Sequence, residues 1–385
     1  MEFGICFKGD MDPKRTVALA RQAEAAGFSY CWTFDSHVLW KECYTMLALI
    51  AASTRKVHFG PLVTNPAVRD ITVTASALAT LNVISGGRAE CAIGRGDSSR
   101  RVLGRKPTTV ERMMEAVEQI RTLAEGGHLD YDGVDTSFPW ANPEQKLPIW
   151  IAGYGPRVLH AAGAHADGIV LQIAYPFLIQ WFVEQTRKGA EEAGRDPTRI
   201  KFMSAAPVWV SKDKAQGRAQ VRWFPAMVGN HVADLVVRYH GGELPGELTD
   251  YVEGRKGYDY HHHADKDADH LDFISDEIIE KFTILGAAEE HVTKLRELES
   301  IGVDQFVIYL MSGEEEATVR SYGSDIIPAF TGNKPAARRA TVSRPAKKPA
   351  RRAGARKKPE ANRAGQAAKK TISRTPLQNR ATARG

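Results

Sequence analysis

The chain has 385 residues, and 43% of them are hydrophobic, which is enough to form a large buried core. Its formal net charge of +6 conceals a division: residues 332–385 hold 17 Lys and Arg with one acidic residue, whereas residues 1–331 hold 35 basic and 45 acidic residues. No apolar stretch reaches the roughly 20 residues that cross a bilayer, and the four cysteines lack disulfide or zinc-like spacing. These features exclude a membrane-spanning or disulfide-stapled protein and indicate a cytoplasmic one.

Short strand-like runs alternate with helical patterns over residues 1–331. The first run, residues 3–7, is followed by Asp12 and Pro13, which are typical of the cap and first position of a helix, and this helix stops at Gly27. The further expected strands are residues 30–33, 57–64, 88–93, 149–152, 168–171, 202–210 and 305–309. The further expected helices are residues 46–52, 73–83, 110–124, 157–166, 177–193 and 289–300.

Eight strands that alternate with helices predict a parallel sheet with right-handed crossovers, either closed as a barrel or open and doubly wound. No Gly-x-Gly-x-x-Gly pattern follows the first strand, as it would in a dinucleotide-binding open sheet. The count of eight units also fits a barrel. We therefore predict a (β/α)₈ TIM barrel.

Residues 241–272 interrupt the alternation and are rich in Gly, Tyr, His and Asp. We expect an insertion that forms a lid over one face of the barrel. Its run of histidines, residues 261–263, has no helical pair one turn apart that a third ligand would complete into a metal site. A solvent-facing lid is therefore favoured over metal binding, and no metal is predicted.

Residues 332–385 consist mostly of Ala, Pro, Lys and Arg. Such a segment cannot bury enough surface to offset the entropy lost on ordering, so we expect a disordered tail after a catalytic domain of residues 1–331. A polycation of this kind binds nucleic acid or other polyanions weakly and without sequence preference, unless it is simply a solvated extension. A gel shift that survives deletion of the tail would contradict its role in such binding.

Five glycine-containing patterns occur in order along residues 1–330. They are residues 27–37, residues 60–66 with Arg69 after them, residues 85–97, residues 148–156 and residues 286–306. Any one of them is weak evidence, because glycine-rich turns occur in every barrel. Together they resemble the luciferase-like monooxygenase superfamily, in particular its coenzyme F420-dependent oxidoreductases of the methylenetetrahydromethanopterin reductase type.

The resemblance implies an oxidoreductase that transfers a hydride between the deazaflavin F420 and a small organic substrate, with the cofactor carrying the redox chemistry. An FMN-dependent monooxygenase that acts with a separate flavin reductase is the alternative within enzymes. A non-catalytic barrel that binds a flavin or polyanion is the alternative outside them. Members of the superfamily are often homodimers or homotetramers, so the resemblance also implies self-association.

Barrel enzymes place their active sites at the carboxyl ends of the strands, and the motif residues follow those ends. Asp35 is the expected catalytic residue, assisted by His37 or Ser36, as proton donor or ring-orienting group. The expected cofactor-binding residues are Trp40, Leu62, Val63, Thr64, Asn65, Gly94, Arg95, Gly96, Asp97, Gly153, Tyr154 and Gly155. The resemblance further implies a bulge in the third strand with a non-proline cis peptide bond at Leu62–Val63.

Several of these residues admit a plainer interpretation. Asp35 has Trp32 and Trp40 near it in sequence, which favours a partly apolar pocket suited to proton transfer, although a solvated loop carboxylate is the alternative. His37 can equally be an ordinary loop histidine. The four glycines of the expected cofactor site either bring backbone N–H groups close to a ring or phosphate, or only turn strand into helix; they are Gly94, Gly96, Gly153 and Gly155. The basic cluster Arg95, Arg100, Arg101 and Arg105 either meets the cofactor's phosphate or acidic tail, with Arg95 favoured, or is a solvated loop.

Overall fold

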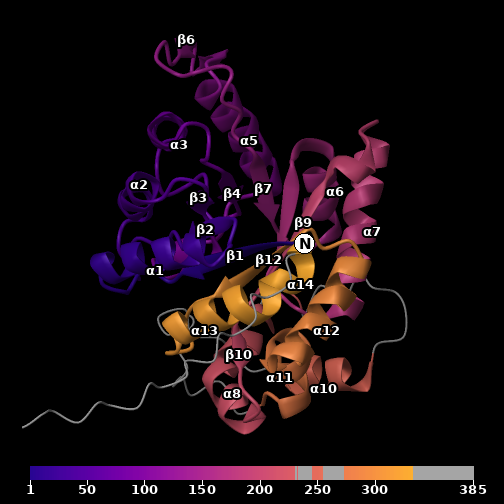
Figure 1. The fold of residues 1–385 in the computed structure, drawn as a ribbon. Coiled ribbons are helices and arrows are strands. Elements are labelled where there is room, and N and C mark those ends of the chain that lie inside the picture. The colour runs from indigo at the N-terminus through magenta and orange to yellow at the C-terminus, as the bar shows by residue number, and fades with distance from the viewer. Residues whose placement is uncertain (230–231, 233–244, 255–272, 333–385) are drawn as a thin grey trace, which may run out of the picture. The chain divides into compact units, whose positions relative to one another are not determined.

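The computed structural model describes residues 1–229, 232, 245–254 and 273–332 (Figure 1). The predicted basic tail beyond Gly332 and the histidine-rich part of the predicted insertion lie outside these residues. The domain boundary after residue 331 therefore stays a prediction. Within the predicted insertion the structure describes one helix, α10 (Gly246–Gly254). The lid remains a prediction.

Eight parallel strands form the barrel: β1 (Glu2–Phe7), β2 (Tyr30–Thr33), β3 (His58–Pro61), β4 (Cys91–Ile93), β7 (Ile149–Ala152), β8 (Gly168–Leu171), β9 (Lys201–Ala206) and β12 (Gln305–Tyr309). They are hydrogen-bonded in the order β3-β2-β1-β12-β9-β8-β7-β4. Parallel bridges from Phe59 to Ala89 and from Thr64 to Ile93 join the two outer strands and close the sheet. The predicted (β/α)₈ barrel is confirmed.

Helices follow the barrel strands and cover the outside of the barrel (Figure 1). The main ones are α1 (Pro13–Ala25), α2 (Cys43–Ser53), α3 (Ile71–Ser85), α5 (Val110–Ala124), α6 (Pro156–His165), α7 (Pro176–Glu192) and α12 (Ala288–Ser300). Shorter helices are α4 (Asp97–Arg101), α8 (Lys214–Val221), α11 (Asp276–Phe282), α13 (Glu315–Ser321) and α14 (Ile327–Thr331), with a 3₁₀ turn at Pro197–Arg199 and a π-helical turn at Tyr322–Ile326. Asp12 caps α1 as predicted, since its carboxylate accepts hydrogen bonds from the backbone N–H groups of Lys14 and Arg15.

The expected strand over residues 202–210 is two strands in the structure. β9 belongs to the barrel, whereas β10 (Val208–Val210) pairs with β11 (Ile284–Gly286) in a separate two-stranded parallel sheet. Pro207 lies between them, and a proline has no N–H group to continue a hydrogen-bonded ladder. A second small sheet, the hairpin of β5 (His128–Tyr131) and β6 (Val134–Ser137), was not anticipated from the sequence.

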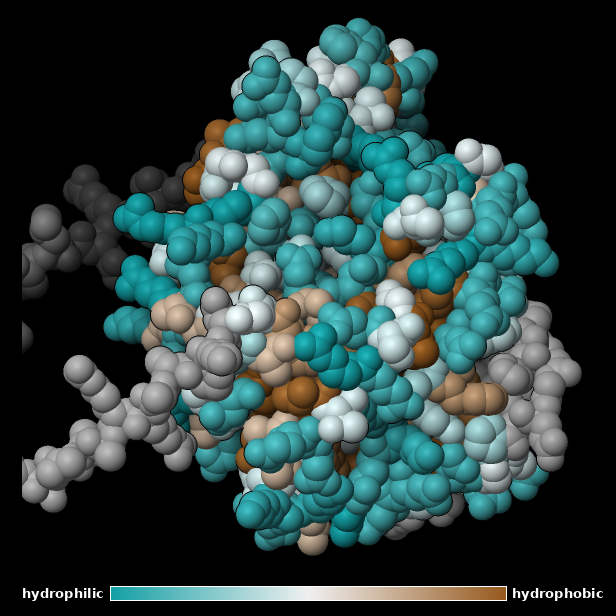
Figure 2. Space-filling model, turned by 45° about the vertical axis from the view of Figure 1, so that its right-hand side comes forward, coloured by the Kyte–Doolittle hydropathy of each residue, from teal (hydrophilic) through white to brown (hydrophobic). Residues whose placement is uncertain are grey.

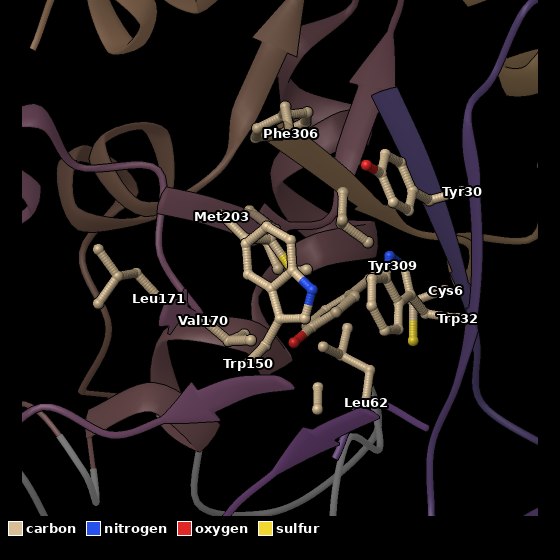
Figure 3. Packing of buried hydrophobic residues seen from close by; sticks show 14 of the residues in the cluster. Cys6, Tyr30, Trp32, Leu62, Trp150, Val170, Leu171, Met203, Phe306 and Tyr309 are labelled. Carbon is tan, nitrogen blue, oxygen red and sulfur yellow. The ribbon is translucent and has the colours of Figure 1, made fainter. Parts of the chain in front are cut away.

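The barrel interior is filled by large side chains from opposite strands. Figure 3 shows Trp32, Trp150 and Tyr309 gathered there, and the rings of Trp32 and Trp150 meet edge to face with centroids 6.3 Å apart. Trp150 also donates a hydrogen bond of 2.6 Å from its indole nitrogen to the buried Glu90 carboxylate. A Cβ atom at Gly168 would overlap the Trp150 ring, so the glycine makes room for this packing.

The outside of the described part is mainly polar on the face seen in Figure 2, where hydrophobic residues occupy small areas between hydrophilic ones. Among the helices of the described residues, none combines the length and the apolar character that crossing a membrane requires.

His291 is a fully buried histidine that joins α12 to the rest of the domain. Its Nε2 lies 3.2 Å from the Trp209 carbonyl oxygen and its Nδ1 lies 3.0 Å from the Tyr322 hydroxyl. A carbonyl can only accept, so Nε2 carries the proton and Nδ1 accepts from the phenol. Burial, as the largest cause, lowers the pKa of His291 to about 4.

This histidine predicts a loss of stability in acid. Between pH 6.5 and pH 4, this histidine binds a proton in the unfolded chain but not in the folded protein. The free energy of unfolding should therefore be highest above pH 6.5 and fall by up to about 3 kcal/mol as the pH drops through 4. Urea unfolding of the wild type and of His291→Gln should show a flatter dependence on pH in the variant. His128→Gln, at an exposed histidine, is the control; equal pH slopes in wild type and His291→Gln would contradict the prediction.

Candidate active site

A pocket of about 820 Å³ opens at the carboxyl ends of the barrel strands. It is lined by residues that directly follow β2, β3, β4, β7 and β8, together with Met227 from the segment after α8. The predicted residues that line it are Asp35, Trp40, Leu62, Val63, Gly94, Arg95, Gly96, Asp97, Gly153, Tyr154 and Gly155. The predicted residues Ser36, His37, Thr64 and Asn65 do not line it.

The peptide bond between Leu62 and Val63 is cis, as the resemblance implied. Both side chains line the pocket just beyond the end of β3. Leu62 is buried, and its side chain lies with Tyr309 and Trp150 in the barrel interior (Figure 3).

The expected apolar surroundings of Asp35 are not what the structure shows. Arg69 donates two hydrogen bonds to its carboxylate, of 2.7 Å to Oδ2 and 3.0 Å to Oδ1, and the Thr64 hydroxyl donates a third, of 2.8 Å to Oδ2. Trp32 is directed into the barrel interior, because side chains alternate along a strand. Trp40 does line the pocket, where it packs against Phe34 with ring centroids 5.0 Å apart.

Arg69 was not predicted as a site residue, although it stands inside the second sequence motif. It also donates to Glu42 at 2.8 Å, and its guanidinium lies 4.7 Å above the centre of the Tyr44 ring. Burial, followed by the nearby Asp35 carboxylate, raises the pKa of the Tyr44 phenol, so this hydroxyl stays protonated and donates to Thr64 at 3.0 Å. The result is one connected network behind the pocket wall.

Ser36 and His37 do not reach the pocket. The Ser36 hydroxyl is buried and has no hydrogen-bond partner among the described residues. His37 is exposed, as an ordinary loop histidine would be. Their assistance to Asp35 stays a prediction that the geometry does not support.

Asn65 supports the pocket from behind. Its amide nitrogen donates to the Ser99 hydroxyl at 3.0 Å, and its amide oxygen accepts from the backbone N–H of Ala67. Gly96 precedes α4 with a left-handed φ of +79°, and a Cβ atom there would come within 2.9 Å of Asn65. Gly96 is therefore required by conformation and packing, whatever else binds near it.

Four cationic side chains line the pocket: Arg95, Arg101, Lys106 and Arg157. Arg95 donates to the Thr108 carbonyl, Arg101 pairs with Asp97, and Arg157 pairs with Glu111. Lys106 has no ion-pair partner among the described residues. Of the predicted basic cluster, Arg100 and Arg105 lie outside the lining. Two cations of the lining were not foreseen: Lys106, which directly follows Arg105, and Arg157, in the first turn of α6.

Two helices also begin at this pocket. Neither α4 nor α6 has a side-chain cap at its N-terminus, where the cap residues are Gly96 and Gly155. The first residues of both helices line the pocket. The uncapped N-terminus of α6, with cationic side chains in the same pocket lining, is suited to binding an anionic group such as a phosphate. α4 has only five residues and begins with Asp97, so its N-terminus is not suited to this.

The floor of the pocket holds a neutral hydrogen-bonded chain. Gln172 donates from Nε2 to the Tyr309 hydroxyl at 2.7 Å and accepts through Oε1 from the Tyr154 hydroxyl at 3.2 Å. Burial raises the pKa of both phenols, so the chain positions groups by hydrogen bonding and carries no charge. Sequence reasoning identified Tyr154 and missed Gln172 and Tyr309. Elsewhere in the described ranges, no cluster of His, Cys, Asp or Glu could hold a metal ion.

Comparison with known proteins assigns the fold to a family. A family model described as luciferase-like monooxygenase matches residues 1–305. The chain belongs to this family. A 5,10-methylenetetrahydromethanopterin reductase of Archaeoglobus fulgidus is 32% identical over 336 residues, which cover 85% of this chain and 99% of that protein.

Two further relatives bear on the luciferase-like barrel. An F420-dependent hydroxymycolic acid dehydrogenase of Mycobacterium tuberculosis is 32% identical over 226 residues, covering 54% of this chain and 62% of its own. The structure of the coenzyme F420-dependent tetrahydromethanopterin reductase from Methanopyrus kandleri matches with a TM-score of 0.69 and 25% identity, over 86% of this chain and 99% of that one.

In this luciferase-like barrel, Gly153 packs closely against the Val158 side chain, and substitution can test whether that packing requires a glycine. A Cβ atom at Gly153 would overlap the Val158 side chain, so Gly153→Ala should lower the free energy of unfolding by about 1–3 kcal/mol. Measured in a Val158→Ala background, the same substitution should cost far less, because the obstructing methyl groups are gone. Chemical denaturation of the four proteins gives both costs; an equal cost in the two backgrounds would contradict the packing role.

Proposed function

We propose that this protein is a coenzyme F420-dependent oxidoreductase that transfers a hydride between the deazaflavin and a small organic substrate. The observation that carries the proposal is the match over 99% of the length of a coenzyme F420-dependent reductase, in sequence and in fold. A second F420-dependent enzyme, the dehydrogenase of Mycobacterium tuberculosis, is 32% identical over the part that it shares.

The pocket residues fit such a cofactor. Its phosphate and acidic tail would lie near the uncapped start of α6, among Arg95, Lys106 and Arg157. Its planar ring would lie against the apolar part of the lining, which comprises Phe34, Trp40, Leu62, Val63 and Met227. A pocket whose lining includes both cationic and apolar side chains is what a planar ring joined to an anionic tail requires.

When bound, the deazaflavin supplies or accepts the hydride at its C5 atom. The protein's contribution is to orient groups and exclude water. Asp35 offers hydrogen-bond acceptors at the pocket wall, and Gln172 presents an amide whose orientation Tyr154 and Tyr309 fix. Neither the phenols nor the amide changes charge near neutral pH, so they position the reactants without exchanging protons with solvent.

The alternative is an FMN-dependent monooxygenase supplied by a separate flavin reductase, which the family description keeps open. FMN also has a planar ring and a phosphate, so it would fit the same pocket. It lacks the acidic tail, and therefore gives the outer cations less to bind. A non-catalytic barrel is disfavoured by the enzymes that match along the whole domain.

Titration of the cofactor-free protein with F420 and with FMN distinguishes these functions. We expect F420 to bind at least about tenfold more tightly than FMN, measured by the change in cofactor fluorescence. Lys106→Gln should weaken F420 binding by about threefold and reduce its dependence on salt, because an exposed cation contributes modestly. Lys188→Gln, on the outer face of α7, is the matched control. Tighter binding of FMN than of F420 would overturn the assignment.

We also propose that the protein self-associates through α2 and α3. Neither helix contains a charged residue, and Leu49, Val73 and Ile84 are each more than two-fifths exposed. Beside them Trp140 is half exposed and stacks on Phe138, which also lines a shallow hollow along α3. A second copy is the favoured occupant, because an uncharged surface with both a protrusion and a hollow can pair with itself about a two-fold axis.

Light scattering in solution tests this interface. The wild type should have the mass of a dimer or a multiple of it, and Ile84→Asp should shift the protein toward the monomer because it places a charge in the apolar contact. Val38→Asp, at a comparably exposed position on the loop after β2, should leave the mass unchanged. A wild-type monomer at micromolar concentration would contradict the proposal.

A further inference from the structure

The Asp35 carboxylate is held by more donors than a structural surface ion pair requires. Its side chain is 1% exposed and receives three hydrogen bonds, two from Arg69 and one from Thr64. One bond reaches Oδ1 and two reach Oδ2, so Oδ1 retains the greater capacity to accept another donor. Asp35 lines the pocket, whereas Arg69 is not among the lining residues.

Arg69 is itself fixed in place. It is shared between Asp35 and Glu42, and Glu42 caps α2 by accepting from the backbone N–H of Thr45 at 2.7 Å. Its guanidinium also lies over the Tyr44 ring, so one planar group is oriented by two carboxylates and an aromatic face. These contacts of Arg69 with Asp35 and Glu42, called the clamp below, connect the loop after β2 to the loop after β3 and to the start of α2.

We propose that Arg69 is a positioning residue that keeps Asp35 as an oriented carboxylate, so that Asp35 acts on the bound cofactor as a hydrogen-bond acceptor for a ring N–H and not as a proton donor. This inference deepens the proposed function and rests on it for the identity of the ligand. The bidentate contact fixes the plane of the carboxylate and engages both of its oxygens.

Cofactor binding at different pH values provides the first test. The wild type sets the reference for the affinity for F420 from pH 5.5 to pH 8. In Arg69→Gln the buried carboxylate loses its partner and takes up a proton more readily, so binding should be about tenfold weaker at neutral pH and weaken further as pH falls. Arg69→Lys, which keeps the charge but not the bidentate geometry, should lie between them.

The matched control is Arg15→Gln. Arg15 also shares its guanidinium between two carboxylates, Glu315 and Glu316, but it lies outside the pocket lining. Its loss should leave both the affinity for F420 and the pH dependence of binding as in the wild type. Asp35→Asn should bind weakly at every pH, because it cannot regain the carboxylate.

A second measurement needs no cofactor and so separates this inference from the proposed function. In Arg69→Gln the buried carboxylate of Asp35 has lost its partner, so the contribution of Asp35 to stability should fall as pH rises. The melting temperature of this variant should therefore drop more between pH 5.5 and pH 8 than that of the wild type. The double variant Asp35→Asn/Arg69→Gln should lose that added dependence.

The outcomes distinguish the two ideas. Failure of the wild type to bind F420, with the expected melting behaviour intact, would refute the proposed function and leave the clamp. Unchanged affinity and an unchanged pH profile in Arg69→Gln would overturn the positioning role. If Arg69→Gln lowers the melting temperature equally at pH 5.5 and pH 8, Arg69 and Asp35 form only a structural ion pair, and the positioning role is wrong.

Discussion

Eight parallel strands that close on themselves must all end at the same rim of the barrel, and the chemistry of this protein depends on that constraint. Each loop after a strand needs to extend only a few residues to meet its neighbours. Asp35 and Thr64 follow adjacent strands and are in direct contact, although they are separated by 29 positions in the chain. Gln172 and Tyr309 are separated by 137 positions and are equally close. The rim assembles one polar site from segments that are distant in sequence.

The strands and helices were predictable because burial imposes a pattern that a sequence shows directly. The runs 30–33 and 149–152 and the helix over residues 110–124 match the observed elements. The failures have local causes. Pro207 divides what is otherwise one apolar run. The β5–β6 hairpin was overlooked because its strands have only four residues each, although β5 alternates between exposed and partly buried residues and Asp132 and Gly133 form its turn.

The site was harder to predict, since its residues could be named but not their partners. Asp35 was expected among tryptophans that lie near it in sequence, whereas its true neighbours are Arg69 and Thr64. Arg69 was visible in a motif, yet nothing in the sequence indicates that a residue 34 positions away is its partner. The same limit applies to a glycine of the site. Gly153 lines the pocket, but a side chain is excluded there by Val158, a contact that only the folded structure reveals.

The shared guanidinium of Arg69 also restricts how this rim can change in evolution. A substitution at Asp35 alone leaves a half-buried cation with Glu42 as its one remaining carboxylate, and a substitution at Arg69 alone leaves a buried anion beside another acid. A protein with only one of these two substitutions should be less stable than a protein with neither substitution or with both. Homologous sequences should therefore vary at these two positions together, and a lineage that has lost one partner should have lost the other. Among relatives that keep the pair, divergence in substrate choice is then left to the rest of the pocket wall.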